Sequence, residues 1–245
     1  MAASEPTILA TCGGLLKGRR ASYDFGPLMH FAAELAEVSG RKVRWCHVGT
    51  ATGDQRYQNA WMSEAGEEAG VEVTHLNLFP KLCADDLRAY VLGQDVIWVS
   101  GGSIENLLVL WRLHGLGDIF EEAWHKGIVL SGTSAGSICW HTGAASNLFS
   151  STKIAITDGL AFVPYSNCVH YEVELDRRER YKQLVSDGTL ADGYGIDNGV
   201  GLLYRGTRLV EVVSEVTGRN AYSVTKKGAK ALEEKIIPRL LPGAS

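Results

Sequence analysis

The sequence lacks the features that mark membrane, secreted and zinc-binding proteins. None of its 245 residues belong to an apolar run long enough to cross a bilayer. Residues 1–6 (MAASEP) have neither the basic region nor the apolar core of a signal peptide. The five cysteines are scattered and form no CxxC pair, which argues against a zinc site and favours buried thiols in a reducing compartment. We therefore expect a cytoplasmic protein with no membrane partner.

An excess of charge of one sign is also missing. The 24 lysines and arginines and the 28 aspartates and glutamates give a formal net charge of −4, which does not favour general affinity for nucleic acid. Hydrophobic residues make up 45% and charged residues 21% of the chain, as is usual for globular proteins. Since repeats, low-complexity segments and obvious linkers are absent, we expect a single domain spanning residues 1–245.

Apolar runs rich in β-branched residues alternate with stretches of helical spacing through the first half of the chain. Strands are expected at residues 7–11, 43–48, 71–78, 95–100 and 127–130. Helices are expected at residues 27–39, 57–69, 84–92, 104–113 and 119–125. This alternation predicts an α/β fold, with a mainly parallel sheet covered by helices on both faces. In such a sheet, ligands bind at the edge where the strands end.

The pattern changes in the second half of the chain. Residues 160–171 are expected to be extended, and residues 174–185 read as a charged amphipathic helix. Three short strands joined by glycine turns follow, which is typical of an antiparallel sheet; they are expected at residues 194–204, 207–213 and 219–224. Residues 229–241 are expected to form a closing helix or tail. The part from roughly 194 to 245 is thus an antiparallel extension with a closing tail.

Residues 127–137 (GIVLSGTSAGS) carry the strongest indication of chemistry. An apolar strand runs directly into small residues, with Ser134 flanked two positions away by Gly132 and Gly136. This pattern is typical of a nucleophile elbow, a sharp strand-to-helix turn that exposes its central side chain and aims the next amide, that of Ala135, at the same point. A serine hydroxyl becomes a good nucleophile when held in this way beside a base. The alternative is a glycine-rich turn without chemistry.

Among the seven histidines, His170 is the best candidate for that base. It ends the extended run 167–171 just before the charged helix, and the end of a strand lies at the ligand-binding edge. A structural or surface role is the better interpretation for the others, which are His30, His47, His75, His114, His125 and His141.

Taken together, these segments resemble the peptidase E-like serine peptidases of peptidase family S51, whose members include aspartyl dipeptidases and cyanophycinases. The resemblance runs from about residue 8 to residue 224. Three segments carry it: WVSGGS at 98–103 with Leu107 and Leu108 in the next helix, the elbow at Ser134, and His170-Tyr171 leading into RRER at 177–180. It implies a three-layer α/β sandwich similar to class I glutamine amidotransferases, which have cysteine at the elbow. It implies no metal or organic cofactor, and a homodimer is one candidate assembly.

The resemblance also implies roles for individual residues. In the family, the serine is the acylated nucleophile and the histidine its base, which correspond here to Ser134 and His170. The glycine pair of the family supplies one amide of the oxyanion hole, which corresponds to Gly101 or Gly102. The second amide corresponds to Ala135.

The third catalytic position departs from the family pattern. Members often carry a glutamate in a segment resembling Gly-Ile-Asp-Glu, whereas residues 195–199 of this chain are GIDNG, so the matching residue is Asn198. An asparagine can orient the imidazole tautomer, as in Cys-His-Asn proteases, but cannot stabilise the imidazolium by charge. Asp197 is the second candidate, although neighbours on an extended strand point to opposite faces. Asp158 is the third, with a turn residue before a glycine as its alternative interpretation.

The substrate is indicated by the arginines that follow His170. Arg177 best matches an arginine common in the family's helix, and a guanidinium can bind a substrate carboxylate through two hydrogen bonds; the alternative is a solvated helix face. Residues 167–169 (NCV) lack the glutamines that cyanophycinases tend to have near their catalytic histidine, which favours the peptidase branch.

We therefore predict a serine exopeptidase or dipeptidase that hydrolyses small peptides, including those with N-terminal aspartate, through an acyl-enzyme on Ser134. Three alternatives stay open. They are a cyanophycinase-like enzyme, an amidase or esterase acting on a non-peptide substrate, and a peptide-binding module that has lost catalysis together with the glutamate.

Overall fold

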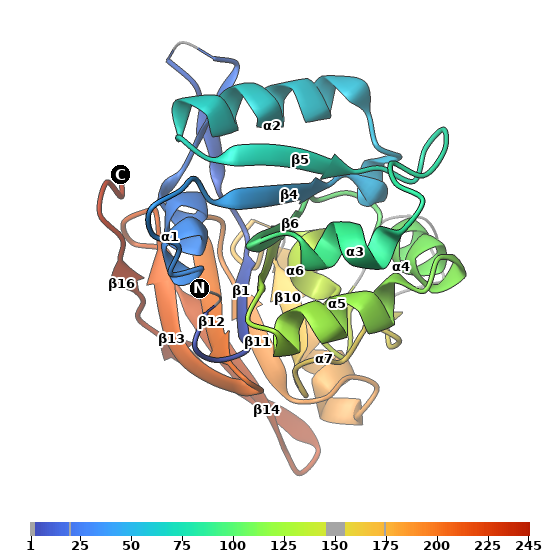
Figure 1. Cartoon of the computed structure of the whole chain (residues 1–245). Coiled ribbons are helices and arrows are strands. Elements are labelled where there is room, and N and C mark those ends of the chain that lie inside the picture. Colours follow the sequence, from blue (N-terminus) through green and yellow to red (C-terminus); the bar gives the residue numbers. More distant parts are fainter. Residues whose placement is uncertain (1–2, 20, 146–154, 174) are drawn as a thin grey trace.

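The computed structural model describes residues 3–19, 21–145, 155–173 and 175–245 (Figure 1). Its helices are α1 (Pro27–Leu35), the 3-10 helix η1 (Thr50–Thr52), α2 (Arg56–Glu68), α3 (Leu87–Leu92), α4 (Ile104–Leu113), α5 (Leu116–His125), α6 (Ala135–Ile138) and α7 (Leu175–Asp187). Its strands are β1 (Thr7–Thr11), β2 (Leu15–Lys17), β3 (Tyr23–Phe25), β4 (Arg44–Val48), β5 (Glu72–Leu76), β6 (Val96–Val99), β7 (Val129–Thr133), β8 (Ala144–Ala145), β9 (Ala155–Ile156), β10 (Ser166–Val169), β11 (Gly193–Ile196), β12 (Val200–Arg205), β13 (Arg208–Ser214), β14 (Ala221–Lys227), β15 (Lys230–Ile236) and β16 (Arg239–Leu240).

The described residues form a central sheet of eight strands in the order β16-β13-β12-β1-β7-β6-β4-β5. The pairs from β1 to β5 are all parallel, whereas β12 runs antiparallel to both β1 and β13. The strand β7 lies between β1 and β6, in the interior of the sheet. The residue that follows β7, Ser134, therefore emerges at the centre of the carboxyl edge, where β1, β4 and β6 also end.

Successive residues of the parallel strands face two different helical layers. Trp45, Trp98 and Val129 pack with buried residues of α1 and α2. The opposite face packs against α3, α4, α5 and α6, through residues such as Cys46 and Leu130, and Figure 1 shows α3, α4 and α5 gathered on one side of the sheet. The predicted α/β class, a mainly parallel sheet between two helical layers, is confirmed.

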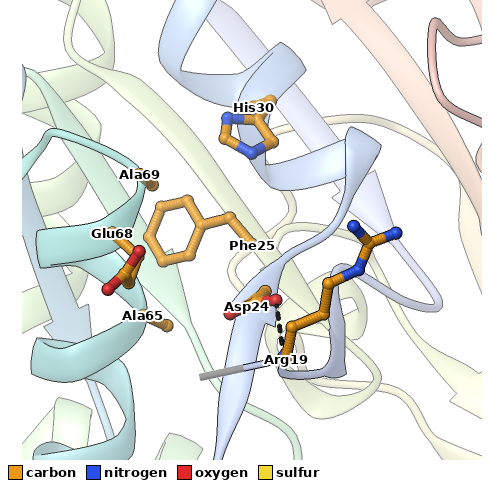
Figure 2. Close-up of a pocket in the computed structure, with 7 residues that line it drawn as sticks. All are labelled: Arg19, Asp24, Phe25, His30, Ala65, Glu68 and Ala69. Carbon is orange, nitrogen blue, oxygen red and sulfur yellow. Dashed lines mark hydrogen bonds between the residues drawn. The ribbon is translucent and has the colours of Figure 1, made fainter. Parts of the chain in front are cut away.

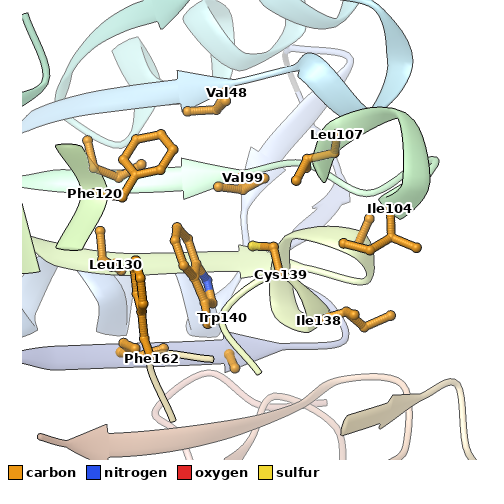
Figure 3. Close-up of a cluster of buried hydrophobic side chains, with 14 of the residues drawn as sticks. Val48, Val99, Ile104, Leu107, Phe120, Leu130, Ile138, Cys139, Trp140 and Phe162 are labelled. Atoms are coloured by element: carbon orange, nitrogen blue, oxygen red, sulfur yellow. The ribbon is translucent and has the colours of Figure 1, made fainter. Parts of the chain in front are cut away.

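Aromatic packing holds α6 against the sheet behind Ser134 (Figure 3). The Trp140 ring, just after α6, lies 5.9 Å from the Phe120 ring of α5 and 5.8 Å from the Phe162 ring, measured between centroids. Phe120 and Leu130 are fully buried, and each such side chain contributes about 1.5–3 kcal/mol relative to an exposed one. The short helix that begins at the elbow is thus fixed by the core.

A second sheet, in the order β10-β11-β14-β15, provides the other side of the candidate site. The strand β10 runs parallel to β11, and α7 covers this sheet through Tyr181, Leu184 and Val185, which pack with Cys168 and Val224. The chain passes from β11 of the second sheet to β12 of the central sheet through residues 197–199. This crossing places Asn198 where the two sheets meet.

Three parts of the chain differ from the sequence-based expectation. Residues 194–204 were expected as one strand, but they divide into β11 and β12, which belong to different sheets. Residues 229–241 were expected as a closing helix or tail, but they contain β15, which pairs antiparallel with β14, and β16, which pairs parallel with β13. The reason is a tertiary contact: Glu233 of β15 forms an ion pair with Arg178 of α7, and Ala231 packs beside it on the core of the second sheet. The hairpin of β2 and β3 was not predicted. No helix in the described part of the chain is long and apolar enough to span a bilayer.

Candidate active site

The turn from β7 to α6 holds Ser134 in a conformation that L-residues rarely adopt, with φ 55° and ψ −111°. The flanking glycines make this turn feasible. A Cβ atom on Gly132 would lie 2.5 Å from the carbonyl oxygen of Val99, and one on Gly136 would lie 2.0 Å from the same atom. Any side chain there would push the elbow off β6. Within this turn, the backbone is strained at Ser134, whose side chain is half-buried.

Three side chains from separate elements meet at this elbow. The Oγ atom of Ser134 lies 3.2 Å from Nε2 of His170, and Nδ1 of the same imidazole lies 2.6 Å from Oδ1 of Asn198. His170 follows β10 with φ 58°, and the next amide, that of Tyr171, donates to the carbonyl of Ile196 at 3.1 Å. A hydroxyl, an imidazole and a side-chain acceptor in this order can carry out acyl transfer.

Asp197 and Asn198 point to different partners. The Asp197 carboxylate accepts the backbone N–H of Asn220 at 2.9 Å, is 3% exposed, and has its pKa raised by burial. The backbone N–H of Asn198 donates to the Glu172 carboxylate at 3.0 Å, and this carboxylate pairs with Arg219 at 3.1 Å. The structure therefore brings Asn198, and not Asp197, to His170.

Asp158 lies elsewhere. Its carboxylate pairs with the guanidinium of Arg112, at the end of α4, with an N–O distance of 3.0 Å, and its side chain is 57% exposed. The structure does not bring Asp158 to His170.

The loop after β6 lies directly against the elbow. A Cβ atom on Gly101 would be 3.1 Å from Cβ of Ser134, and one on Gly102 would be 2.5 Å from the carbonyl oxygen of Ala51. Ser103 then caps α4 by accepting the amide of Asn106 at 3.1 Å. Within the described ranges, the amides of Gly101, Gly102 and Ala135 donate to no protein acceptor. Their role as an oxyanion hole beside Ser134 stays a prediction.

Arg177 is buried beneath β10, 9% exposed. Its guanidinium donates to the carbonyl oxygen of Val169 at 3.2 Å, one residue before His170. It therefore supports the end of the strand that presents the histidine. Its role as a ligand for a substrate carboxylate stays a prediction.

A pocket of about 370 Å³ opens beside the His170–Asn198 pair. Its cationic side chain is Arg219, and its lining also includes a buried carboxylate, Glu215, which accepts the amides of Gly14 at 2.8 Å and Leu28 at 3.2 Å. Burial raises the pKa of Glu215. The lining residues are Cys12, Gly13, Thr133, His170, Asn198, Gly199, Glu215, Val216 and Arg219.

Four of the residues around the site were not found by sequence reasoning: Cys12, Glu172, Glu215 and Arg219. Cys12 was interpreted as one of several buried thiols, although it stands at the end of β1, before a glycine pair, which is the position that indicates the ligand-binding edge. The carboxylates and Arg219 have no local signal, because their partners lie far away in the sequence.

A buried polar network supports the Gly101 loop from the other side. The Nε2 atom of His47 lies 2.8 Å from Oγ of Ser100, and its Nδ1 atom lies 3.1 Å from Nδ1 of His75. Burial lowers the pKa of His47 to about 3. Ser100 directly precedes Gly101, so this network fixes the end of β6.

The described residues of the site include no group of metal ligands, and a second pocket lies apart from them. Within residues 3–19, 21–145, 155–173 and 175–245, no three His, Cys, Asp or Glu side chains are grouped so as to hold a metal ion. A larger pocket of about 460 Å³ has no lining residue in common with the site (Figure 2). It is lined by Arg19, Asp24, Phe25, His30, Ala65, Glu68 and Ala69.

Comparison with known proteins gives related chains and folds. The model of peptidase family S51 matches residues 15–212. The chain is 39% identical over 190 residues to an uncharacterized peptidase, YgaJ, of Bacillus subtilis strain 168, which covers 78% of this chain and 81% of that protein.

Two solved structures have a similar fold. The crystal structure of a peptidase from an acI-B1 Actinobacterium superimposes with a TM-score of 0.67 and 19% identity, over 97% of this chain and 96% of that one. A putative peptidase E from Listeria monocytogenes EGD-e gives a TM-score of 0.59 and 17% identity, over 84% of this chain and 98% of that one.

Proposed function

Since this chain belongs to peptidase family S51, and is therefore a peptidase, we propose that it cleaves peptide bonds with Ser134 as nucleophile and His170 as base. The family that the sequence motifs indicated is confirmed by the match over residues 15–212. The observation that carries the proposed mechanism is the 3.2 Å contact between Ser134 Oγ and His170 Nε2, made at an elbow whose strained backbone exposes the serine.

The proposed reaction proceeds through an acyl-enzyme. Nε2 of His170 takes the hydroxyl proton as Oγ of Ser134 attacks the carbonyl carbon of the scissile bond. The amide of Ala135 and one amide of the Gly101-Gly102 pair donate to the oxyanion. His170 then gives its proton to the leaving amine, and water repeats the sequence to release the acyl group. Asn198 accepts from Nδ1–H throughout and so holds the tautomer that leaves Nε2 free.

For the substrate, we propose small peptides with an acidic N-terminal residue, released as in a dipeptidase. Arg219 supports this proposal, because it lines the pocket beside His170 and a guanidinium is well suited to a carboxylate. Its present partner is Glu172, so an incoming carboxylate would share the guanidinium with that side chain.

The test uses purified full-length protein, a set of dipeptides that differ in the first residue, and a fluorophosphonate probe. We expect Asp-Xaa peptides to be cleaved fastest and the probe to label Ser134. In the variant Ser134→Ala, kcat should fall on the order of 10⁴–10⁶-fold. In His170→Ala it should fall nearly as far, and in the double variant it should be little lower than in either single variant. Ser186→Ala, on α7 away from the site, serves as the matched control and should keep full activity.

The alternatives give different results. Activity of Ser134→Ala within about tenfold of the unmodified protein would show that the serine mechanism is wrong. Probe labelling with turnover of esters alone would indicate an amidase or esterase. Peptide binding without labelling or turnover would indicate a binding module that has lost catalysis.

A further inference from the structure

Cys12 touches both members of the His170–Asn198 pair. Its Sγ donates to Oδ1 of Asn198 at 3.2 Å, accepts the backbone N–H of His170 at 3.4 Å, and lies 3.3 Å from Nδ1 of the same ring. The side chain is 3% exposed and is a free thiol. These three contacts place the thiol between the imidazole and the amide, where it can influence how the two side chains face each other.

An asparagine at this position raises a problem that a carboxylate does not. Its amide has an oxygen that accepts and a nitrogen that donates, on two ends of nearly equal size. With Oδ1 facing His170, the ring carries its proton on Nδ1 and Nε2 is free to take the proton of Ser134. With Nδ2 facing His170, the ring proton moves to Nε2 and the base is blocked. In another serine protease, an asparagine that imposes the wrong tautomer lowers kcat roughly 10⁴-fold.

The thiol of Cys12 distinguishes the two orientations of the amide. With Oδ1 facing the ring, the amide oxygen has two lone pairs and accepts both from Nδ1–H and from the thiol, which lies 3.2 Å away. With Nδ2 facing the ring, Nδ1 has a single lone pair, for which the amide N–H and the thiol, 3.3 Å away, compete. Burial raises the pKa of Cys12 to about 12, so the thiol remains a donor at neutral pH. The backbone N–H of Asn198 is held by Glu172, which fixes the main chain but leaves the rotation of the amide group to its own contacts.

We propose that Cys12 is a positioning residue that keeps the oxygen of the Asn198 amide turned to His170 and so maintains the imidazole tautomer that can accept the proton of Ser134. The proposal rests on the role of His170 proposed above. It concerns the protonation site of the ring, which can be observed without turnover.

The kinetic test compares Cys12→Ala in two backgrounds. In the unmodified protein, we expect kcat to fall about tenfold, the size of one net hydrogen bond, with KM unchanged, because the tautomer affects the proton transfer and not ground-state binding. Asn198→Asp provides the second background, since a carboxylate accepts through both oxygens and has no wrong orientation. There, Cys12→Ala should change kcat by less than about twofold. Cys12→Ser retains the donor and should restore kcat in the asparagine background.

The spectroscopic test records ¹⁵N spectra of histidine-labelled protein, with the His170 signals assigned from a His170→Gln sample. We expect the proton on Nδ1 in the unmodified protein and in Cys12→Ser, and a shift of population towards Nε2–H in Cys12→Ala. An unchanged tautomer in Cys12→Ala, or an equal loss of kcat in both backgrounds, would overturn the proposal. If Ser134→Ala kept its activity while the tautomer still followed Cys12, the peptidase mechanism would fail and the positioning role would stand.

Discussion

At the residue scale, Asp197 and Asn198 are adjacent in the chain but lie in different surroundings. The Asp197 carboxylate is buried against the amide of Asn220, whereas the Asn198 side chain faces His170. The turn that separates them is completed by Gly199, which has φ 84°, a value that favours glycine. Asp197 thus stabilises the turn between the two sheets, and Asn198 faces the imidazole.

This difference predicts opposite effects of alanine at the two positions. Asn198→Ala should lower kcat, because tautomer control is removed. The fold-loss should be roughly 100 times smaller than that of Ser134→Ala, because the nucleophile and the base remain. Asp197→Ala leaves the Asn220 amide buried without an acceptor and should lower the free energy of unfolding by roughly 1–3 kcal/mol, with kcat close to normal. Kinetics and urea unfolding of the two variants test the assignment. An inactive Asp197→Ala beside a normal Asn198→Ala would reverse it.

Negative charge at position 198 gives a further check. Asn198→Asp keeps the size of the side chain, and Asn198→Glu restores the family residue. Either carboxylate favours the protonated imidazole, so the acidic limb of the kcat/KM profile should move to higher pH. A limb that stays in place would show that position 198 is not coupled to His170.

The sequence predicted the neighbourhood of Ser134 and His170 because the elbow and the strand end are local patterns. It left Asp197 and Asn198 open, since a shift of one residue in the end of β11 exchanges the two side chains. Cys12 could not be paired with Asn198 in advance, because 186 residues separate them. Contacts of that kind depend on how the two sheets meet.

At the element scale, the elbow depends on how closely α6 and β6 approach. A Cβ atom on Gly136 would overlap the carbonyl oxygen of Val99. This oxygen belongs to the backbone, which cannot move away as a flexible side chain can. The local sequence signals were sufficient for most strands and helices. They failed for β15, where the inward Glu233 is stabilised by Arg178 of a distant helix, because tertiary pairing decides such ambiguous segments.

Gly136→Ala should therefore disturb both stability and the nucleophile. Overpacking of this kind costs about 1–3 kcal/mol, and occasionally more, and the displaced elbow should slow labelling of Ser134 by the fluorophosphonate probe. Gly93→Ala is the matched control, since Gly93 has φ −78° and its Cβ would meet the nearest atom at 3.4 Å; it should be neutral or stabilising by about 0.4–1 kcal/mol. Similar unfolding midpoints and labelling rates for both variants would contradict the close-packing argument.

At the scale of the whole molecule, the candidate site is made by two sheets, and its stability depends on pH through groups buried around them. His141 is fully buried, with Nδ1 2.9 Å from the carbonyl oxygen of Ser137 and Nε2 3.1 Å from the hydroxyl of Tyr204. Burial lowers the pKa of His141 to about 4. The unfolded chain binds a proton at this residue near pH 6.5, well before the folded protein does.

Proton uptake by the unfolded chain determines how the stability changes with pH. Between about pH 6.5 and pH 4 the unfolded state binds more protons at His141, so the free energy of unfolding falls as the pH falls. The loss is about 1.4 kcal/mol per pH unit. Asp54, Asp197 and Glu215 act in the opposite sense, because burial raises their pKa values and the folded protein takes up their protons first. The contribution of His141 is therefore best isolated as a difference between variants.

His141→Asn removes the titrating group and should be less stable than the unmodified protein at pH 7.5, because a buried hydrogen bond is lost. As the pH is lowered from 6.5 to 4.5, the unmodified protein loses the stability linked to His141 while the variant does not, so the difference should narrow by about 1.4 kcal/mol per pH unit. Tyr204→Phe removes the hydroxyl partner but keeps the histidine, so its difference from the unmodified protein should not narrow in this way. Urea unfolding of the three proteins at several pH values measures both differences. If the His141→Asn difference stayed constant down to pH 4.5, the buried imidazole would not be held neutral by the fold, and the acid sensitivity would have to come from another group.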